Sequence, residues 1–552
     1  MPEFARCLWL LSASGAYAAA LVVIRGRPSV GGDAGVFVSV AGRLLRGDRL
    51  YVNVLDNKDP LFFYSDAAAL GVLGWRGPFL LDVVWLTVAA TSTVLLLRAI
   101  GASRVTAAVG FVAYPLLLTG AWYYSGYSML AVLAFAPLIG WLWIRDSLAL
   151  AGALFGVGLL FKVNLALVLA SAPLAFLLLR LPAGSVRAQV ARAAAGFGVL
   201  VAAAAAILAL RGELHGYLEN LINNVTYSRN VLPATGRLSG IMGHIKVAAG
   251  ATGKQPWHFA VFAAAFLLTG LLAIRTLRHV ELKSGQPVRS SAMHALAALF
   301  LCSTVATAVT LALTAAWSEH DQILAYPGLM LIAFLVAMAG GAAATLPRTV
   351  AACAAAGLGI ALLGGTAASK SSSGGVPIST WTEASRSETA DLLERAADDR
   401  FPQLHEITFA HLGQNDEQGA AAFLDDRFVL ACPAIAQYVF TPDLPGVLRC
   451  IQDEKPRLVL VTPSFTSISH APITWNRFVV GGESLLSNGY QRLLGQQTGR
   501  GWTEIWALPA EAGSAGVSRR PASSLSRAFD VSFQGVTTES LFQGMPVAIS
   551  KE

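Results

Sequence analysis

The chain has 552 residues, of which 55% are hydrophobic and 13% charged, with a formal net charge of +7 and a mean hydropathy of +0.57. This composition is too apolar for a soluble enzyme, because many stretches approach the roughly 20 apolar residues that a helix needs to cross a bilayer. The positive charge gives no reason to expect a nucleic-acid partner, since basic residues in a membrane protein set its orientation and meet lipid phosphates. We therefore expect a polytopic α-helical membrane protein, and the wealth of Ala and Arg favours a bacterial one.

Hydropathy predicts eleven membrane spans. The first has no small-residue cleavage site, so we interpret it as a retained helix and not as a signal peptide. The predicted spans are residues 8–25, 78–97, 105–120, 127–144, 148–161, 163–179, 194–210, 257–274, 292–316, 322–340 and 349–366.

Basic residues alternate between the short connections. They gather near Arg98, Arg145, Arg187, Arg278 and Arg348, whereas the connections "TGAWYYSGYS" and "WSEHDQ" contain no Lys or Arg. The positive-inside rule then places the amino terminus in the cytoplasm, and eleven spans place the carboxyl-terminal region outside. The long loops 26–77 and 211–256 also face outward. The expected location is a bacterial inner membrane.

The composition changes near Lys370, where "SKSSSGGVPIST" is typical of a linker. Residues 1–368 would form the membrane module, residues 381–509 an extracytoplasmic α/β domain, and residues 510–552 a disordered tail. Within the α/β domain, "EITFAHLG", "RFVLAC", "RLVLVTP" and "TEIWAL" predict strands, and "EQGAAAFLDD" and "PGVLRCIQDE" predict helices.

The cysteines leave two alternatives open. Cys432 and Cys450 lie in the α/β domain, where disulfides persist if it is exported, so either a bridge or two free thiols fits the sequence. Cys7, Cys302 and Cys353 lie in or beside spans and are interpreted as packing residues. No His/Cys group has the spacing of a zinc site.

The first outward loop opens with an amphipathic pattern. Phe37, Val40, Leu44 and Leu45 share one helical face, which is typical of a helix lying in the membrane interface, whereas the nearby arginines lie largely elsewhere. Asp33 comes just before this face. It is either a helix cap or a functional carboxylate.

The stretch "LYVNVLDNKDPLFFY" follows that helix. Asp56, Lys58 and Asp59 could form a solvated turn before Pro60, and this explains the proline well. It does not explain why charges gather between an interfacial helix and another apolar run. We therefore predict a polar site at the outer membrane surface.

Several segments resemble one family. An early outward Asp, then "LLRGDRLYVNVLDNKDPLFFY", resembles the first loop of polyprenyl-phosphate-sugar glycosyltransferases of the GT-C class, the superfamily of protein O-mannosyltransferases and lipid A aminoarabinose transferases. "GLLFKVN", with Lys162, "YLENLINNVTYSRN" and "SEHDQILAYPGL", with His320 and Pro327, resemble later segments of that family in the same order.

The resemblance implies transfer of a sugar from a polyprenyl-phosphate donor to an extracytoplasmic hydroxyl acceptor, with inversion. Asp33 matches the catalytic acidic position and would be the general base. Lys58 matches the lysine near the donor phosphate, where a cation stabilises the leaving group. Lys162 has an argument of its own, because a lysine at mid-bilayer costs about 2.5–3.5 kcal/mol and should lie at a helix end or serve a function.

The resemblance also suggests roles for five further residues. Arg229 and His320 would contact the donor phosphate or the acceptor, Asp56 would hold Lys58, and Tyr123 and Tyr227 would support the site. Acidic residues found in relatives are missing from the loop "YYSGYS", so we predict no bound metal. We expect no cofactor beyond the donor as co-substrate, and the predicted partners are the donor, the acceptor and membrane lipids.

The leading alternative is a multi-span transporter or flippase for a lipid-linked or polar substrate. Transporters place charges at mid-membrane, in interrupted helices and in related halves of the chain. Here the candidate charges lie at outward ends and no half is duplicated, which favours the enzyme. A non-catalytic scaffold is the third alternative, and it should tolerate loss of Asp33.

Overall fold

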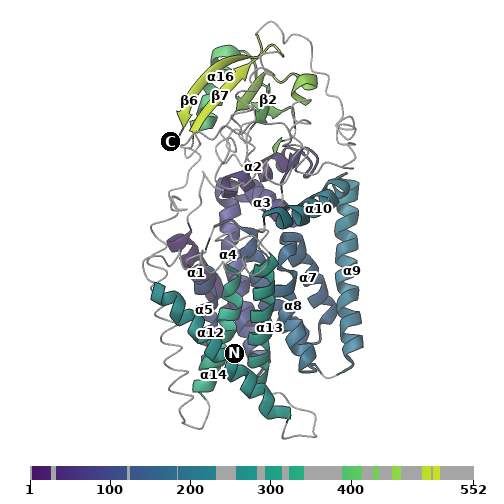
Figure 1. Ribbon diagram of the computed structural model, residues 1–552, viewed down its shortest axis with the longest axis vertical. Coiled ribbons are helices and arrows are strands. Elements are labelled where there is room, and N and C mark those ends of the chain that lie inside the picture. Colours follow the sequence, from purple (N-terminus) through teal and green to yellow (C-terminus); the bar gives the residue numbers. More distant parts are fainter. Residues whose placement is uncertain are drawn as a thin grey trace.

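A computed structural model describes residues 3–26, 33–56, 58–120, 123, 125–182, 184–231, 256–281, 292–313, 322–340, 388–412, 427–432, 434–435, 450–461, 488–498 and 501–509. The helices form an elongated bundle, and a five-stranded sheet lies beyond one end of it (Figure 1). The amino terminus lies toward the other end.

The bundle contains long and short apolar helices. They are α1 (Glu3–Arg25), α4 (Gly77–Ala99), α5 (Arg104–Leu118), α6 (Ser128–Ile144), α7 (Leu148–Phe161), α8 (Ala166–Leu178), α9 (Val186–Leu210), α12 (Pro256–Glu281), α13 (Ala292–Leu313) and α14 (Ala325–Ala339). Ten of the eleven predicted spans coincide with these helices, and the eleventh, 349–366, lies outside the described residues.

Five segments of the described chain are long and apolar enough to cross a membrane: Cys7–Arg25, Gly77–Ala99, Val186–Leu210, Ala292–Leu313 and Gln322–Ala339. Most of the other bundle helices are shorter, and α12, with 26 residues, is the exception. α7, with 14 residues, is only about 21 Å long at about 1.5 Å per residue, whereas the hydrocarbon core is about 30 Å thick. The count of eleven spans therefore stays a prediction.

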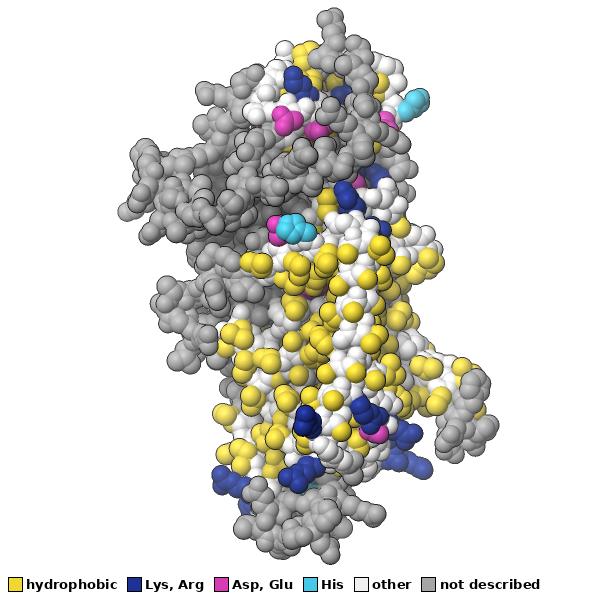
Figure 2. All heavy atoms as spheres, turned by 90° about the vertical axis from the view of Figure 1, so that its right-hand side faces the viewer, with side chains coloured by type: hydrophobic (Ala, Val, Ile, Leu, Met, Phe, Trp, Pro, Cys, Tyr) yellow, Lys and Arg dark blue, Asp and Glu magenta, His cyan; other side chains and the backbone are white. Residues whose placement is uncertain are grey.

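The surface of α9 shows what surrounds the bundle. This helix is strongly apolar, yet only 6% of its most apolar 18 residues are buried. A helix that is apolar on nearly all sides and yet uncovered by protein is stable in lipid and not in water. Figure 2 shows hydrophobic side chains over this face, with Lys and Arg side chains gathered at its lower end. The protein is therefore built as a helical membrane protein.

The predicted amphipathic helix is α2 (Asp33–Leu45). Its apolar face packs against α3 (Pro60–Leu73), a second helix within the predicted loop 26–77. Phe37 lies edge-on to Phe62, with ring centroids 5.0 Å apart, and Val40 and Leu44 are also buried. This face is thus largely covered by protein, with only Leu45 among the predicted residues half-exposed.

The carboxyl-terminal part contains a mixed sheet in the order β3-β2-β5-β7-β6. Its strands are β2 (Ile407–Leu412), β3 (Phe428–Leu430), β5 (Leu458–Val461), β6 (Gln491–Thr498) and β7 (Gly501–Ala507). The four predicted strands coincide with β2, β3, β5 and β7, whereas β6 and the helix α16 (Glu388–Arg400) were not predicted. The predicted helix 417–426, the linker and the tail lie outside the described residues, and only 450–454 of the predicted helix 445–454 is described, as helix.

A disulfide and a short strand pair bring distant segments together. Cys432 and Cys450 are bridged, which decides between the two alternatives that the sequence left open. Two residues after Cys432, β4 (Ala434–Ile435) pairs in parallel with β1 (Val54–Leu55) of the first loop. The guanidinium of Arg46 also donates to the carbonyl of Phe428, at 3.5 Å. The carboxyl-terminal part thus contacts the first loop beside Lys58.

Candidate active site

Lys58 lies in the turn between β1 and α3, between a carboxylate and an aromatic ring. Its backbone amide donates to Asp56 Oδ1 at 2.9 Å, and the supporting role of Asp56 stays a prediction. Its ammonium nitrogen lies 5.3 Å from the centroid of the Phe37 ring, within the range of a cation–π contact. The lysine side chain is thereby directed toward α2.

The interpretation of this turn as a solvated one is wrong. Asp56 and Asp59 are each 4% exposed, because the turn is enclosed by other segments. A buried carboxylate is stable only when hydrogen bonds or cations compensate for lost hydration. The partners of Asp59 therefore decide the architecture of the site.

Asp59 is bonded to two distant segments. Its Oδ2 accepts a hydrogen bond of 2.9 Å from the backbone amide of Val163, and its Oδ1 accepts one of 2.9 Å from the hydroxyl of Tyr217. Burial raises the pKa of Asp59 to about 6, and these two hydrogen bonds and the charges of Lys162 and Lys58 act in the opposite direction. Sequence reasoning missed Asp59 as a site residue, although its place directly after Lys58 was a signal.

Lys162 lies where α7 ends and the short 3-10 helix η2 (Val163–Leu165) begins. Its backbone is extended, with φ −164° and ψ 97°, and the residue is only 7% exposed. Hence Lys162 stands at a helix end, as its cost in the bilayer predicts, but it is enclosed by protein. It does not extend along the surface to reach water. The charges of Lys162 and Lys58 both lower the pKa of Asp59.

Tyr217 belongs to α10 (Leu214–Val231), whose amino-terminal part lies against the first loop. Its ring centroid is 5.3 Å from that of Tyr51, and the hydroxyl of Tyr51 donates to the carbonyl of Lys58 at 2.6 Å. Burial and the Asp59 carboxylate raise the pKa of Tyr217 above its usual value. The phenol therefore remains a hydrogen-bond donor.

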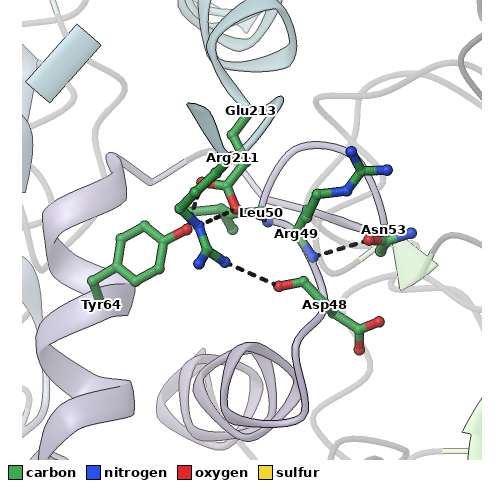
Figure 3. Close-up of polar contacts among 7 residues, drawn as sticks. All are labelled: Asp48, Arg49, Leu50, Asn53, Tyr64, Arg211 and Glu213. Atoms are coloured by element: carbon green, nitrogen blue, oxygen red, sulfur yellow. Dashed lines mark hydrogen bonds and ion pairs between the residues drawn. The ribbon is translucent and has the colours of Figure 1, made fainter. Parts of the chain in front are cut away.

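Glu213, directly before α10, ties that helix to the loop (Figure 3). It is fully buried, and its Oε1 accepts from the amide of Leu50 at 3.1 Å and from Arg211 Nε at 3.0 Å. Its Oε2 accepts from the hydroxyl of Tyr64. The guanidinium of Arg211 lies 5.1 Å from the centroid of the Tyr64 ring. This network was not predicted, because its members are up to 163 positions apart.

Tyr123 has a carboxylate partner that the sequence did not indicate. Asp82 Oδ2 accepts from the hydroxyl of Tyr123 at 2.6 Å, from Ser125 Oγ at 2.9 Å and from the amide of Gly126 at 3.1 Å. The loop "YYSGYS" has no carboxylate of its own, but α4 supplies one to it. The Oδ2 atom of Asp82 therefore binds the loop between α5 and α6 through three hydrogen bonds.

For the remaining predicted site residues the structure describes the backbone only, or nothing. α2 begins at Asp33, one turn before Phe37, so both residues lie on the same helical face. The Asp33 side chain lies outside the described residues, as do the side chains of Tyr227 and Arg229 on α10 and the whole of His320. The described residues contain no group of three or more His, Cys, Asp or Glu placed to hold a metal ion.

Comparison with known proteins gives a likeness among solved structures. No protein-family model and no curated protein matches the sequence. Among solved structures, the chain is similar to the crystal structure of ArnT from Cupriavidus metallidurans in the apo state, with 12% sequence identity and a TM-score of 0.46, over 94% of this chain and 100% of that chain. ArnT is a lipid A aminoarabinose transferase of the GT-C class, one of the kinds of enzyme that the first loop resembles. At this identity and TM-score, the likeness by itself decides neither fold nor function.

Proposed function

We propose that the chain is a membrane glycosyltransferase. It transfers a sugar from a polyprenyl-phosphate donor to an extracytoplasmic hydroxyl acceptor, with inversion at the anomeric carbon. The observation that carries this proposal is the hydrogen bond from the Val163 amide to Asp59, which joins the segment that bears Lys162 to the segment that bears Lys58, about a hundred residues away in the chain. The resemblance of the first loop to GT-C glycosyltransferases supports the same reaction.

The two lysines suit a leaving phosphate. A unit charge at 4 Å contributes about 4 kcal/mol at an effective dielectric near 20, so each lysine can stabilise the phosphate substantially as it departs. Lys58 lies directly before α3, and α3 and α10 lie at the end of the bundle next to the sheet (Figure 1). A donor could therefore keep its phosphate at the lysines and its hydrocarbon tail in lipid.

Asp33 is the proposed base. Its helix reaches Lys58, because Phe37 on the same face contacts the ammonium of that lysine. In the proposed step the acceptor oxygen bonds to the anomeric carbon while the bond from that carbon to the phosphate oxygen breaks. The electron pair leaves on the phosphate, and the acceptor proton passes to the Asp33 carboxylate.

The carboxyl-terminal part would bind or orient the acceptor. This is supported by its contact with the first loop through β1 and β4, three residues before Lys58. The same part carries no catalytic carboxylate in the proposed mechanism. Residues 381–509 expressed alone should therefore transfer no sugar, and transfer by that fragment would contradict this division of roles.

The experiment is transfer of labelled sugar by the purified full-length chain, from a panel of polyprenyl-phosphate donors to acceptors of an envelope extract. Asp33→Asn should lower transfer by about 10²–10⁴-fold, the usual contribution of a general base. Asp56→Asn keeps an oxygen for the Lys58 amide and should lower it far less. Asp146→Asn is a control for expression, since Asp146 only pairs with Arg192, and both side chains are about half exposed.

Three other outcomes are informative. If Asp56→Asn abolishes transfer and Asp33→Asn does not, the base is assigned to the wrong carboxylate. If both variants keep wild-type turnover, the glycosyltransferase proposal is wrong. Movement of an intact donor across proteoliposomes, without cleavage of its sugar–phosphate bond, would favour the transporter.

A further inference from the structure

Asp59 stands at the N-cap position of α3, with φ −79° and ψ 155°, but its side chain makes no capping hydrogen bond to that helix. Aspartate at this position ordinarily binds the free amides of the first turn. Here both carboxylate oxygens are directed away from α3, to Val163 and Tyr217. The local explanation for an aspartate before Pro60 therefore fails, and a long-range one is needed.

The carboxylate is joined to the backbone at both lysines. Asp59 follows Lys58 in the chain, and the amide that it binds belongs to Val163, which follows Lys162. One carboxylate thus determines how closely the two lysine-bearing segments approach each other. The extended backbone of Lys162 lies directly beside this hydrogen bond.

Tyr217 and Tyr51 close a ring of contacts around the turn. Tyr217 donates to Asp59, its ring lies on that of Tyr51, and Tyr51 donates to the carbonyl of Lys58. Hydrogen bonds that close a ring restrict each member more than isolated ones do. The position of the Lys58 backbone is therefore determined from both sides.

The charge of the carboxylate matters as much as its shape. A carboxylate placed between two lysine-bearing segments offsets part of the repulsion between their charges. With Asp59 ionised, the pair of lysines retains a net positive charge for an incoming phosphate. With Asp59 neutral, the lysines repel each other and lose a common anchor.

We propose that Asp59 is a positioning residue, whose carboxylate holds Lys58 and Lys162 at the separation that a donor phosphate requires. The proposal rests on the proposed function for the identity of the ligand. It assigns no proton transfer and no contact with the reacting atoms to Asp59. It predicts that loss of the carboxylate weakens donor binding more than turnover.

A pH dependence follows from the surroundings of this group. The charged and titratable residues that act on Asp59 are Lys58 in the turn, Lys162 at the end of α7 and Tyr217 on α10. Tyr51 also faces Asp59, and Asp56 and Glu213 lie on the side of Tyr51. Because the pKa of Asp59 is about 6, its carboxylate is charged at neutral pH and becomes protonated as the pH falls below that value. Donor affinity should fall over the same range.

The test measures binding of polyprenyl phosphate without a sugar, and donor KM and kcat, with the full-length chain. Asp59→Asn should weaken phosphate binding and raise the donor KM on the order of 10–100-fold, as loss of a buried charged partner does, with a smaller change in kcat. It should also remove the wild-type decline of affinity between pH 7 and 5. Asp146→Asn is the matched control.

Tyr217→Phe keeps the ring against Tyr51 and removes one hydrogen bond to Asp59, so it should weaken binding in the same direction by less. If Asp59→Asn does not fold, Tyr217→Phe tests whether Asp59 positions the lysines. Wild-type affinity and pH dependence in either folded variant would overturn the proposal. If the wild type binds polyprenyl phosphate but transfers no sugar from any donor, the proposed function fails, and the binding series still tests Asp59.

Discussion

The hydroxyl of Tyr123 donates a hydrogen bond of 2.6 Å to Asp82 Oδ2, although the two residues lie 41 positions apart. The same oxygen also accepts from Ser125 and Gly126. Asp82 is 1% exposed, so water cannot replace these partners. One carboxylate on α4 therefore organises the connection between α5 and α6.

Removal of this carboxylate should be costly. Asp82→Ala leaves three donors without their acceptor in a buried site, and we expect a loss of about 3–5 kcal/mol of unfolding free energy. Tyr123→Phe removes one hydrogen bond to a charged group and should cost about 1.5–3 kcal/mol. Thermal unfolding in detergent measures both, and equal stability of the two variants would contradict the shared-acceptor arrangement.

The Glu213 network predicts two variants that differ in their loss of stability. Glu213→Ala should destabilise the chain by about 3 kcal/mol, because the Leu50 amide and the Tyr64 hydroxyl lose their acceptor. Arg211→Ala should cost less, about 0–1 kcal/mol, since the Arg211 side chain is 38% exposed. Protease cleavage of the first loop at increasing temperature would report both. A larger effect of Arg211→Ala would mean that the ion pair, and not the buried acceptor, holds the loop.

Ionisation of Asp59 should cost stability at neutral pH. Its folded pKa of about 6 lies above the usual 3.8, so the folded state binds more protons than the unfolded state between these values. Its contribution to stability is therefore complete below about pH 4 and is lost as the pH rises through 6, by at most about 3 kcal/mol. Melting temperatures from pH 4.5 to 7.5 should rise toward acid less steeply in Asp59→Asn than in the wild type. Parallel curves would contradict the raised pKa.

The disulfide should support the carboxyl-terminal sheet. Cys432 and Cys450 are 18 positions apart, and a bridge closing a loop of this size typically contributes about 3 kcal/mol. The Cys432→Ser and Cys450→Ser double variant should unfold this part at lower temperature, as should the reduced wild type. Maleimide labelling checks the pairing, because Cys7 should react in the unreduced protein while Cys432 and Cys450 should not.

Topology is testable by reporter fusions. The arginine-rich short connections predict that a fusion at Arg187 reports the cytoplasm and that a fusion at Ser373 reports the exterior. Arg187 lies in the first turn of α9. The same side for both fusions would refute the eleven-span arrangement.

Hydropathy and composition determined much of the fold. Ten predicted spans coincide with helices because long apolar runs have few alternatives to a buried or membrane helix. The shift near Lys370 separated the α/β part, and four of its strands followed from short apolar runs. Asp33, Lys58 and Lys162 were selected by local motifs, and the placement of Lys162 at a helix end followed from its cost in lipid.

Tertiary structure decided the partners. Asp59 looked like part of a solvated turn, but Val163 and Tyr217 enclose it from 104 and 158 positions away. The β1–β4 pair and the Glu213 network are equally distant in sequence. Periodicity and spacing report only which face of an element is apolar, because they depend on neighbours within a few residues. Which buried acid meets which donor depends on how the helices pack, and packing is a property of the whole chain.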